Sequence, residues 1–141
     1  MTIKQLSVFL ENTSGRLAEV TRILADAKIN ISAFSLADTA DYGILRLIVD
    51  DPVRAEKMLH EQGCTVHTTD VVGIYVPHKP GGLYKALVVL AENGISIEYM
   101  YAFASREKAM VILRTENIAH TIEALQKSGI EILNPSDAYN A

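Results

Sequence analysis

The chain repeats itself at an offset of 66 residues, and this repeat limits the possible folds more than any other feature. The segment LAEVTRILA, which begins at Leu17, aligns without a gap with LYKALVVLA, which begins at Leu83. Apolar positions of one copy mostly meet apolar positions of the other. We therefore predict two similar small domains, one over residues 1–70 and one over residues 71–141.

Domains of this size bury limited apolar surface on their own, so the high apolar content has to be explained. Hydrophobic residues make up 49% of the chain. The segment that begins at Leu83 is apolar almost all round a helix, which is typical of a helix buried on more than one side. We expect the two copies to share a buried interface, or the chain to form a homodimer.

Charge and residue usage argue against several classes of function. The 13 basic and 17 acidic residues give a net charge of −4 without a basic stripe, so no nucleic acid partner is expected. No run of about 18 apolar residues occurs, so no membrane span is expected, and the charges near the N-terminus argue against a signal peptide. The lone Cys64 favours a reducing, cytoplasmic location, and the four histidines lack metal-site spacing.

Hydrophobic periodicity predicts the order strand, helix, strand, strand, helix, strand in each copy. Leu6, Val8 and Leu10 share one face of a strand, and the residues that follow Leu17 have helical spacing. The predicted strands cover residues 3–10, 29–36, 44–49, 65–70, 72–76, 95–103, 109–113 and 131–133, and the helices 17–27, 52–62, 83–93 and 118–127. The fold class is therefore α+β, with two tandem ferredoxin-like βαββαβ modules, each an antiparallel sheet with its helices on one face.

The turn between the first strand and the first helix of each copy carries the candidate site. Gly15 and Gly81 precede these helices, and a glycine here lets backbone N–H groups point at a bound anion. Thr13 and Ser14 are predicted to cap the first helix. The turn can therefore supply donors for the carboxylate of a small ligand.

A zwitterionic ligand also needs acceptors for its ammonium group, and an amide side chain can both donate and accept. Asn30 in the first copy and Ser96 in the second follow the first helix, where a strand begins. We expect both residues on the same edge of the sheet as the turn. Two or three charge-assisted hydrogen bonds of about 1.5–3 kcal/mol each suit a micromolar to millimolar ligand.

Both copies resemble the ACT domain family over essentially the whole chain. That family has the βαββαβ fold, a loop Asn/Asp-x-Pro-Gly-x-Leu after the first strand, and a turn Gly-x-Asn-Ile after the first helix. The first copy reads NTSGRL and KINI, with Ser14 in place of the proline and Lys28 in place of the glycine. The second copy reads HKPGGL and GISI, with His78 and Ser96 in place of the two asparagines.

The resemblance implies a free-standing, allosteric regulatory protein that senses a free amino acid at the interface between ACT-like domains. It implies an amino-acid biosynthetic enzyme as the regulated partner. In a family member that binds serine, the loop asparagine and the asparagine after the helix hold the ligand, and these positions match Asn12 and Asn30. The candidate ligand-binding residues are Asn12, Thr13, Ser14, Gly15, Arg16, Leu17, Asn30, His78, Pro80, Gly81, Gly82, Leu83 and Ser96. We expect no catalytic residue, metal or cofactor.

Several alternatives remain open at the level of sequence. Asn12 can be a turn residue with an unusual backbone angle, Asn30 a left-handed residue at a helix end, and His78 a surface histidine. The chain can be an interaction module or a regulatory subunit without a ligand of its own. A small ferredoxin-like enzyme such as an acylphosphatase needs an arginine in the first loop; Arg16 is nearby, but Gly82 stands there in the second copy.

Overall fold

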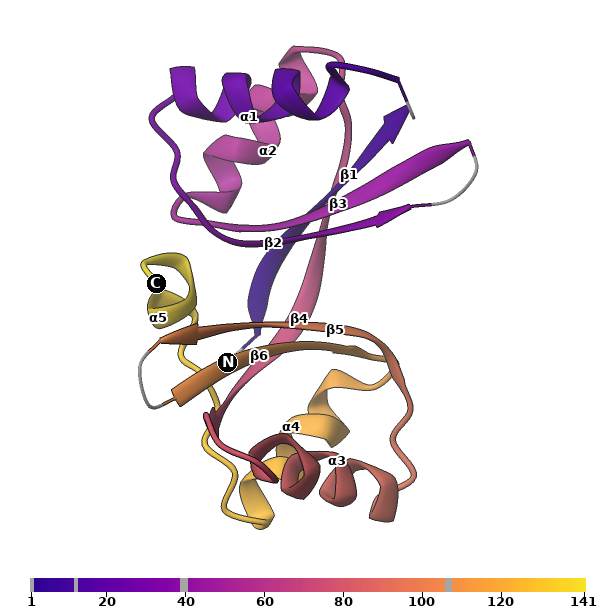
Figure 1. Ribbon diagram of the computed structural model, residues 1–141, viewed down its shortest axis with the longest axis vertical. Helices are drawn as coiled ribbons and strands as arrows, with labels where there is room; N and C mark the ends of the chain where they lie inside the picture. Colours follow the sequence, from indigo (N-terminus) through magenta and orange to yellow (C-terminus); the bar gives the residue numbers. More distant parts are fainter. Residues whose placement is uncertain (1, 12, 39–40, 106–107) are drawn as a thin grey trace. The chain divides into compact units, whose positions relative to one another are not determined.

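The computed structural model of the chain describes residues 2–11, 13–38, 41–105 and 108–141 (Figure 1). Its elements in chain order are β1 (Ile3–Glu11), α1 (Arg16–Asp26), β2 (Ile31–Asp38), β3 (Tyr42–Val49), α2 (Pro52–Glu61), β4 (Thr65–Pro77), α3 (Gly82–Glu92), β5 (Ile97–Ser105), β6 (Lys108–Thr115), α4 (Ile118–Lys127) and α5 (Pro135–Tyr139). No helix in these ranges is both long enough and apolar enough to cross a membrane.

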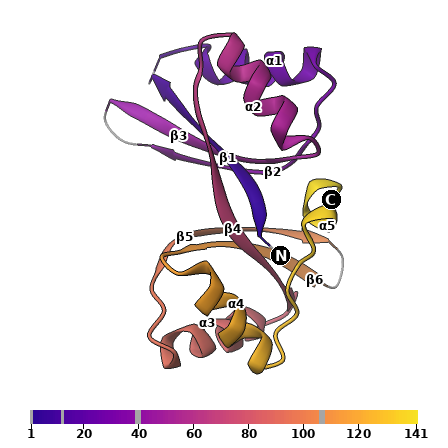
Figure 2. The same cartoon turned by 180° about the vertical axis from the view of Figure 1, so that it is seen from behind.

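The chain divides into two compact units that correspond to the two sequence repeats. One unit comprises Lys4–Thr69 with Tyr139–Ala141, and the other comprises Asp70–Ala138 with the residues up to Ile3. In the first unit, α1 and α2 cover one face of the strands, and α3 and α4 do so in the second (Figures 1 and 2). The predicted fold class, tandem ferredoxin-like modules with antiparallel strands, is confirmed.

Each unit has its own sheet order and its own apolar core. In the first unit the strands follow the order β2-β3-β1, with the first residues of β4 beside β1, and in the second the order is β4-β6-β5. The core between the strands and helices of the first unit includes Leu6, Leu24 and Leu47, which are at most 1% exposed. Ile74, Leu90 and Leu113 occupy the corresponding core of the second unit. In both units, the apolar side chains on one face of the strands therefore pack against the apolar face of the helices.

The strands that link and close the repeats differ from the prediction. The predicted strands 65–70 and 72–76 form one continuous strand, β4, because no turn residue interrupts the chain between them. The predicted closing strand 131–133 is only an isolated bridge, in which Ile132 pairs with Ile74. Backbone bonds on either side of that bridge, Tyr75 N to Glu131 O (2.9 Å) and Leu133 N to Gly73 O (2.7 Å), keep the antiparallel geometry.

The C-terminal residues form the short helix α5, although they are too few to interpret from sequence. Tyr139, the last residue of α5, belongs to the first unit, where its hydroxyl accepts a hydrogen bond from Lys4 N (2.9 Å). Its carbonyl accepts a hydrogen bond from the Ser32 hydroxyl (2.7 Å). The end of the chain thus contacts the first repeat through defined polar bonds.

Candidate functional site

The turn between β1 and α1 ends on Gly15, the N-cap residue of α1, which has a left-handed backbone with φ of 90°. No described side chain caps this helix, so the predicted capping by Thr13 or Ser14 is wrong. Backbone bonds close the turn instead, from Thr13 N to Glu11 O (2.8 Å) and from Arg16 N to Thr13 O (3.4 Å). The positive amide end of α1 is therefore left without a side-chain acceptor.

A hollow of ≈ 180 Å³ lies beside this turn. The end of β1, the start of α1 and the facing ends of β2 and β3 contribute its lining, which consists of Leu10, Glu11, Thr13, Arg16, Leu17, Leu36, Asp38 and Gly43. Three of the candidate residues, Thr13, Arg16 and Leu17, thus line one hollow. Ser14 and Gly15 belong to the same turn, and Asn12 lies outside the described residues.

Side chains of both charges line this hollow together with apolar ones. The Nη1 atom of Arg16 lies 2.9 Å from a carboxylate oxygen of Glu19, in a partly exposed pair one helical turn apart. The buried Nε atom of Arg16 has no hydrogen-bond partner among the described residues. Glu11 and Asp38 bring carboxylates to the same lining, and three leucines complete it. The hollow can therefore meet an anionic, a cationic and an apolar group of one small molecule.

The corresponding turn of the second unit has a different chemistry. Gly81 is the N-cap residue of α3 with φ of 85°, as Gly15 is for α1. Gly82 takes the place of Arg16, and a Cβ atom on it would lie 2.1 Å from the carbonyl oxygen of Pro77. The candidates His78, Pro80 and Leu83 are exposed around this close contact. The second turn thus lacks the arginine charge of the first, and its backbone is packed more tightly.

Asn30 does not share a sheet edge with the turn, so that expectation is wrong. Glu11, the last residue of β1, faces Tyr42 at the start of β3. Ile31, the first residue of β2, faces Val49 at the other end of β3. These two points are seven residues apart along β3 (from 42 to 49), which corresponds to about 23 Å. Within one module, the turn and Asn30 lie at opposite ends of the sheet, because β1 and β2 both run antiparallel to β3.

The backbone of Asn30 is fixed by Asp50, and its side chain is exposed. Asn30 N donates to a carboxylate oxygen of Asp50 (3.0 Å), and Asn30 O accepts from Asp50 N (3.1 Å). The left-handed residue at this helix end is Lys28, with φ of 58°, so the alternative role for Asn30 is also wrong. A single module therefore cannot bring the turn and Asn30 together in one site.

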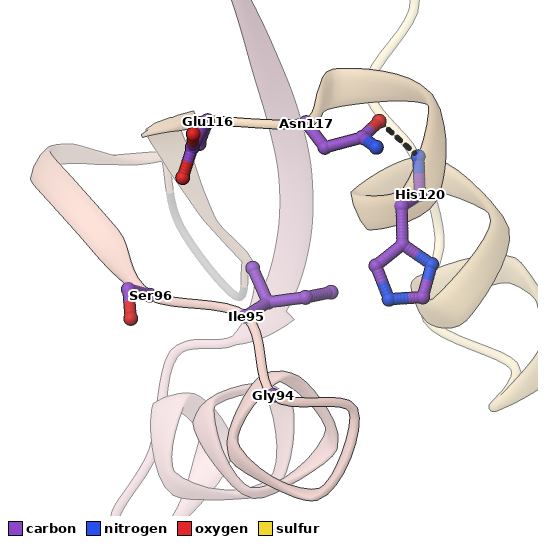
Figure 3. Close-up of a pocket in the computed structure, with 6 residues that line it drawn as sticks. All are labelled: Gly94, Ile95, Ser96, Glu116, Asn117 and His120. Atoms are coloured by element: carbon purple, nitrogen blue, oxygen red, sulfur yellow. Dashed lines mark hydrogen bonds between the residues drawn. The ribbon is translucent and has the colours of Figure 1, made fainter.

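Ser96, the counterpart of Asn30, lines a second hollow of ≈ 540 Å³ in the second unit (Figure 3). Glu116, Asn117 and His120 line it as well, and sequence reasoning missed them. The repeat contains the signal that could have found them, because they align with Asp50, Asp51 and Arg54. Within the described ranges, no group of three histidine, cysteine or acidic residues is placed to hold a metal ion.

The fold and the first hollow together define a class of proteins in which two ferredoxin-like modules follow one another and present a glycine-containing turn at a helix N-terminus. The chain belongs to the ACT domain pair family, whose profile matches residues 1–139. The family resemblance seen in the sequence is therefore confirmed.

Solved structures agree with this assignment. The chain is similar to the protein BT0572 from Bacteroides thetaiotaomicron, with 49% identity and a TM-score of 0.97 over 100% of this chain and 98% of that one. It is also similar to the regulatory subunit of aspartate kinase from Thermus thermophilus, with 17% identity and a TM-score of 0.66 over 88% of this chain and 90% of that one. The regulatory subunit from Thermus flavus gives 17% identity and a TM-score of 0.62 over 89% and 92%. At 17% identity, the likeness to the two Thermus subunits is one of fold alone. No curated protein matches the chain.

Proposed function

We propose that the chain is a non-enzymatic regulatory protein that binds a free amino acid at the turn between β1 and α1. The hollow beside Arg16 supports this proposal most directly, because it combines both charges and apolar surface next to a helix N-terminus that no described side chain caps. A free amino acid carries the complementary set of groups: a carboxylate, an ammonium and a side chain.

The chemistry of the lining assigns each group of the ligand a place. The ligand carboxylate approaches Arg16, whose Nε atom has no partner among the described residues, and the amide end of α1, where the helix dipole favours an anion by about 0.3–1 kcal/mol. The ammonium group approaches the carboxylates of Glu11 and Asp38. The ≈ 180 Å³ of the hollow is less than the about 300–1,000 Å³ of a pocket for a drug-sized ligand, which suits a small amino acid.

Exposed apolar residues beside the hollow favour a second module as part of the site. Leu17 on α1 is 41% exposed, and Phe34 and Leu36 on β2 are 69% and 49% exposed. β2 is the outer strand of its sheet, and an outer strand has unpaired backbone groups. We therefore propose that the chain forms a homodimer through this edge, and that the ligand is bound where ACT-like modules meet. In such a dimer, Asn30 of a second copy supplies the amide that a single module holds too far away.

The regulated partner in this proposal is an amino-acid biosynthetic enzyme. The proteins from the two Thermus species, which share the fold, are regulatory subunits of aspartate kinase. The chain covers about nine-tenths of the Thermus thermophilus subunit, so the two resemble each other over the whole regulatory pair rather than over one module. Binding of the amino acid would act on the partner by changing which arrangement of the modules is more stable.

A thermal-shift panel of the twenty amino acids tests the proposal. One or a few of them should raise the Tm at millimolar concentration, since a ligand that binds only the folded state stabilises it. Arg16→Gln should remove the rise. Arg22→Gln is a matched control, because Arg22 forms a similar ion pair with Asp26 on the same helix, with its nitrogen 2.9 Å from the carboxylate, and does not line the hollow. A flat response of the unmodified protein to all twenty would favour an interaction module without a ligand.

A further inference from the structure

The hollow beside Ser96 belongs to the second unit and lies outside the proposed amino-acid site. Its lining is Gly94, Ile95, Ser96, Glu116, Asn117 and His120, and its volume is ≈ 540 Å³. It lies where β6 ends and α4 begins, next to the end of α3 (Figure 3). The turn before α3 follows Pro77, and Pro77 pairs with Lys108 at the start of β6. The hollow and this turn therefore lie at opposite ends of β6.

In the first unit, the side chain of Arg54 occupies the position that corresponds to this hollow. Arg54 aligns with His120 and Ala27 aligns with Asn93 at the 66-residue offset. The Nη1 atom of Arg54 donates to the carbonyl oxygen of Ala27 at 2.6 Å. Ala27 is the C-cap residue of α1, so the guanidinium of Arg54 binds the negative end of that helix.

The second unit keeps the acceptors but lacks the guanidinium. Asn93 is the C-cap residue of α3, and its carbonyl oxygen lies 3.3 Å from Nε2 of His120. An imidazole is shorter than an arginine side chain and is not permanently charged. The N-terminus of the next helix is otherwise the same in both units. The Asn117 side chain caps α4 by accepting a hydrogen bond from His120 N (3.0 Å). The Asp51 side chain caps α2 in the same way, by accepting from Arg54 N (3.1 Å).

Among the residues that line the hollow, Glu116 is acidic and none is a lysine or an arginine. Asp50, the first-unit counterpart of Glu116, accepts a hydrogen bond from Asn30 N. The Glu116 side chain forms no hydrogen bond or ion pair with any other residue in the described part of the chain. Its carboxylate and the carbonyl end of α3 both favour a cation, and Ile95 offers apolar surface beside them (Figure 3).

We propose that this hollow binds the guanidinium or primary ammonium end of a small ligand, at the position that Arg54 fills in the first unit. The cation donates to the Asn93 carbonyl and pairs with Glu116, while the methylene groups of the ligand lie against Ile95. The site is exposed, so a dissociation constant of about 1 mM is expected.

The test uses three ligands of similar size on the whole chain, followed by 1H–15N NMR. Arginine and agmatine both carry a guanidinium, whereas citrulline has a neutral urea group in its place. Arginine and agmatine should shift the amide signals of residues 94–96 and 116–120, and citrulline should not. A response to arginine but not to agmatine would identify an amino-acid carboxylate, rather than the guanidinium, as the recognised group and would overturn the proposal.

Three variants separate this site from a general charge effect. Glu116→Gln should weaken arginine binding about three- to five-fold, as for an exposed charge pair. Glu123→Gln is the matched control, because Glu123 pairs with Lys127 (2.9 Å) on the same helix outside the hollow and should leave binding unchanged. His120→Arg recreates the arrangement of Arg54 and should abolish binding.

Arginine binding by His120→Arg that equals binding by the unmodified protein would overturn the proposal, as would an equal response to citrulline. Arg16→Gln should leave the shifts at residues 94–96 and 116–120 unchanged. This variant therefore distinguishes a failure at this hollow from a failure at the turn of the first unit.

Discussion

Lys28 and Gly94 occupy the same place in the two repeats and share a left-handed backbone, with φ of 58° and 66°. Each follows the C-cap residue of the first helix of its unit. A left-handed residue with a Cβ costs roughly 1 kcal/mol relative to glycine, so the first unit carries strain that the second avoids. The backbone at this helix end is thus set by the fold and not by the residue that stands there.

Lys28→Gly should stabilise the chain by about 0.5–1 kcal/mol, because it removes this strain, less the entropy that glycine adds to the unfolded state. The measurement is the free energy of unfolding in urea. Gly94→Ala is the reverse experiment, and since nothing lies within 4 Å of its new Cβ atom, its cost of about 1 kcal/mol reports the backbone alone. A loss of stability in Lys28→Gly would show that the lysine side chain contributes more than the strain costs.

Gly82→Ala should destabilise the chain by about 1–3 kcal/mol, although alanine is the better helix former. The new Cβ atom would lie 2.1 Å from the Pro77 carbonyl oxygen, which is backbone and cannot give way alone. Gly81→Ala, with φ of 85° and open space around its Cβ, should cost about 1 kcal/mol and serves as the comparison. A stabilised Gly82→Ala in chemical denaturation would contradict the close contact.

Thr121→Val should cost about 1–3 kcal/mol by leaving a buried hydroxyl without its partner. The hydroxyls of Thr115 and Thr121 lie 2.6 Å apart, and both residues are fully buried. The first unit has Val49 and Ala55 at these positions, also fully buried. The double variant Thr115→Val/Thr121→Ala should therefore lose less than the sum of the losses in Thr115→Val alone and Thr121→Ala alone, as thermal unfolding of these three variants can show. Additive losses would mean that the two hydroxyls are not coupled.

Tyr75→Phe should lower stability by about 0.5 kcal/mol at neutral pH, because it removes the hydrogen bond from the Tyr75 hydroxyl to Asp137 on α5 (3.2 Å). Burial, and then the Asp137 carboxylate, raise the pKa of Tyr75 above its ordinary value of 10.0. The folded state thus favours the neutral phenol, so this contribution is fully present below pH 10 and is lost as the pH rises through the raised pKa.

Unfolding free energies of the unmodified protein and Tyr75→Phe, measured between about pH 8 and pH 11, test this sign. The advantage of the unmodified protein should shrink above pH 10. An advantage that grows with pH would contradict the assigned direction. The phenylalanine ring keeps the contact with Lys108, whose Nζ lies 4.9 Å from the ring centroid of Tyr75, so the variant isolates the hydroxyl.

The sequence predicts the elements well because each repeat carries two clear periodicities and the two copies support one another. The helix predicted over 83–93 is found at Gly82–Glu92, and the predicted second helix of the second copy is found unchanged at Ile118–Lys127. Failures occur where local signals are weak. The short pairing at Ile132 is fixed by hydrogen bonds to a distant strand, and α5 depends on contacts such as that of Asp137 with Tyr75.

The candidate site is only partly predictable from sequence. The turn itself is visible as a glycine before a helix, and Thr13, Arg16 and Leu17 line the hollow that the structure shows there. Leu36 and Asp38 reach the hollow because β2 runs parallel to β1, which spacing along the chain does not reveal. The same strand direction places Asn30 at the far end of the sheet. Predicting that separation requires the strand order as well as the motif.

The most direct measurement is a 1H–15N NMR titration of the chain with the amino acid that gives the largest thermal shift. We expect the backbone amide signals of Gly15, Arg16 and Leu17 to shift in proportion to saturation, and Arg16→Gln to remove these shifts while the protein stays folded. Binding that leaves these three amides unchanged, or that persists in Arg16→Gln with equal affinity, would contradict an amino-acid site at this turn.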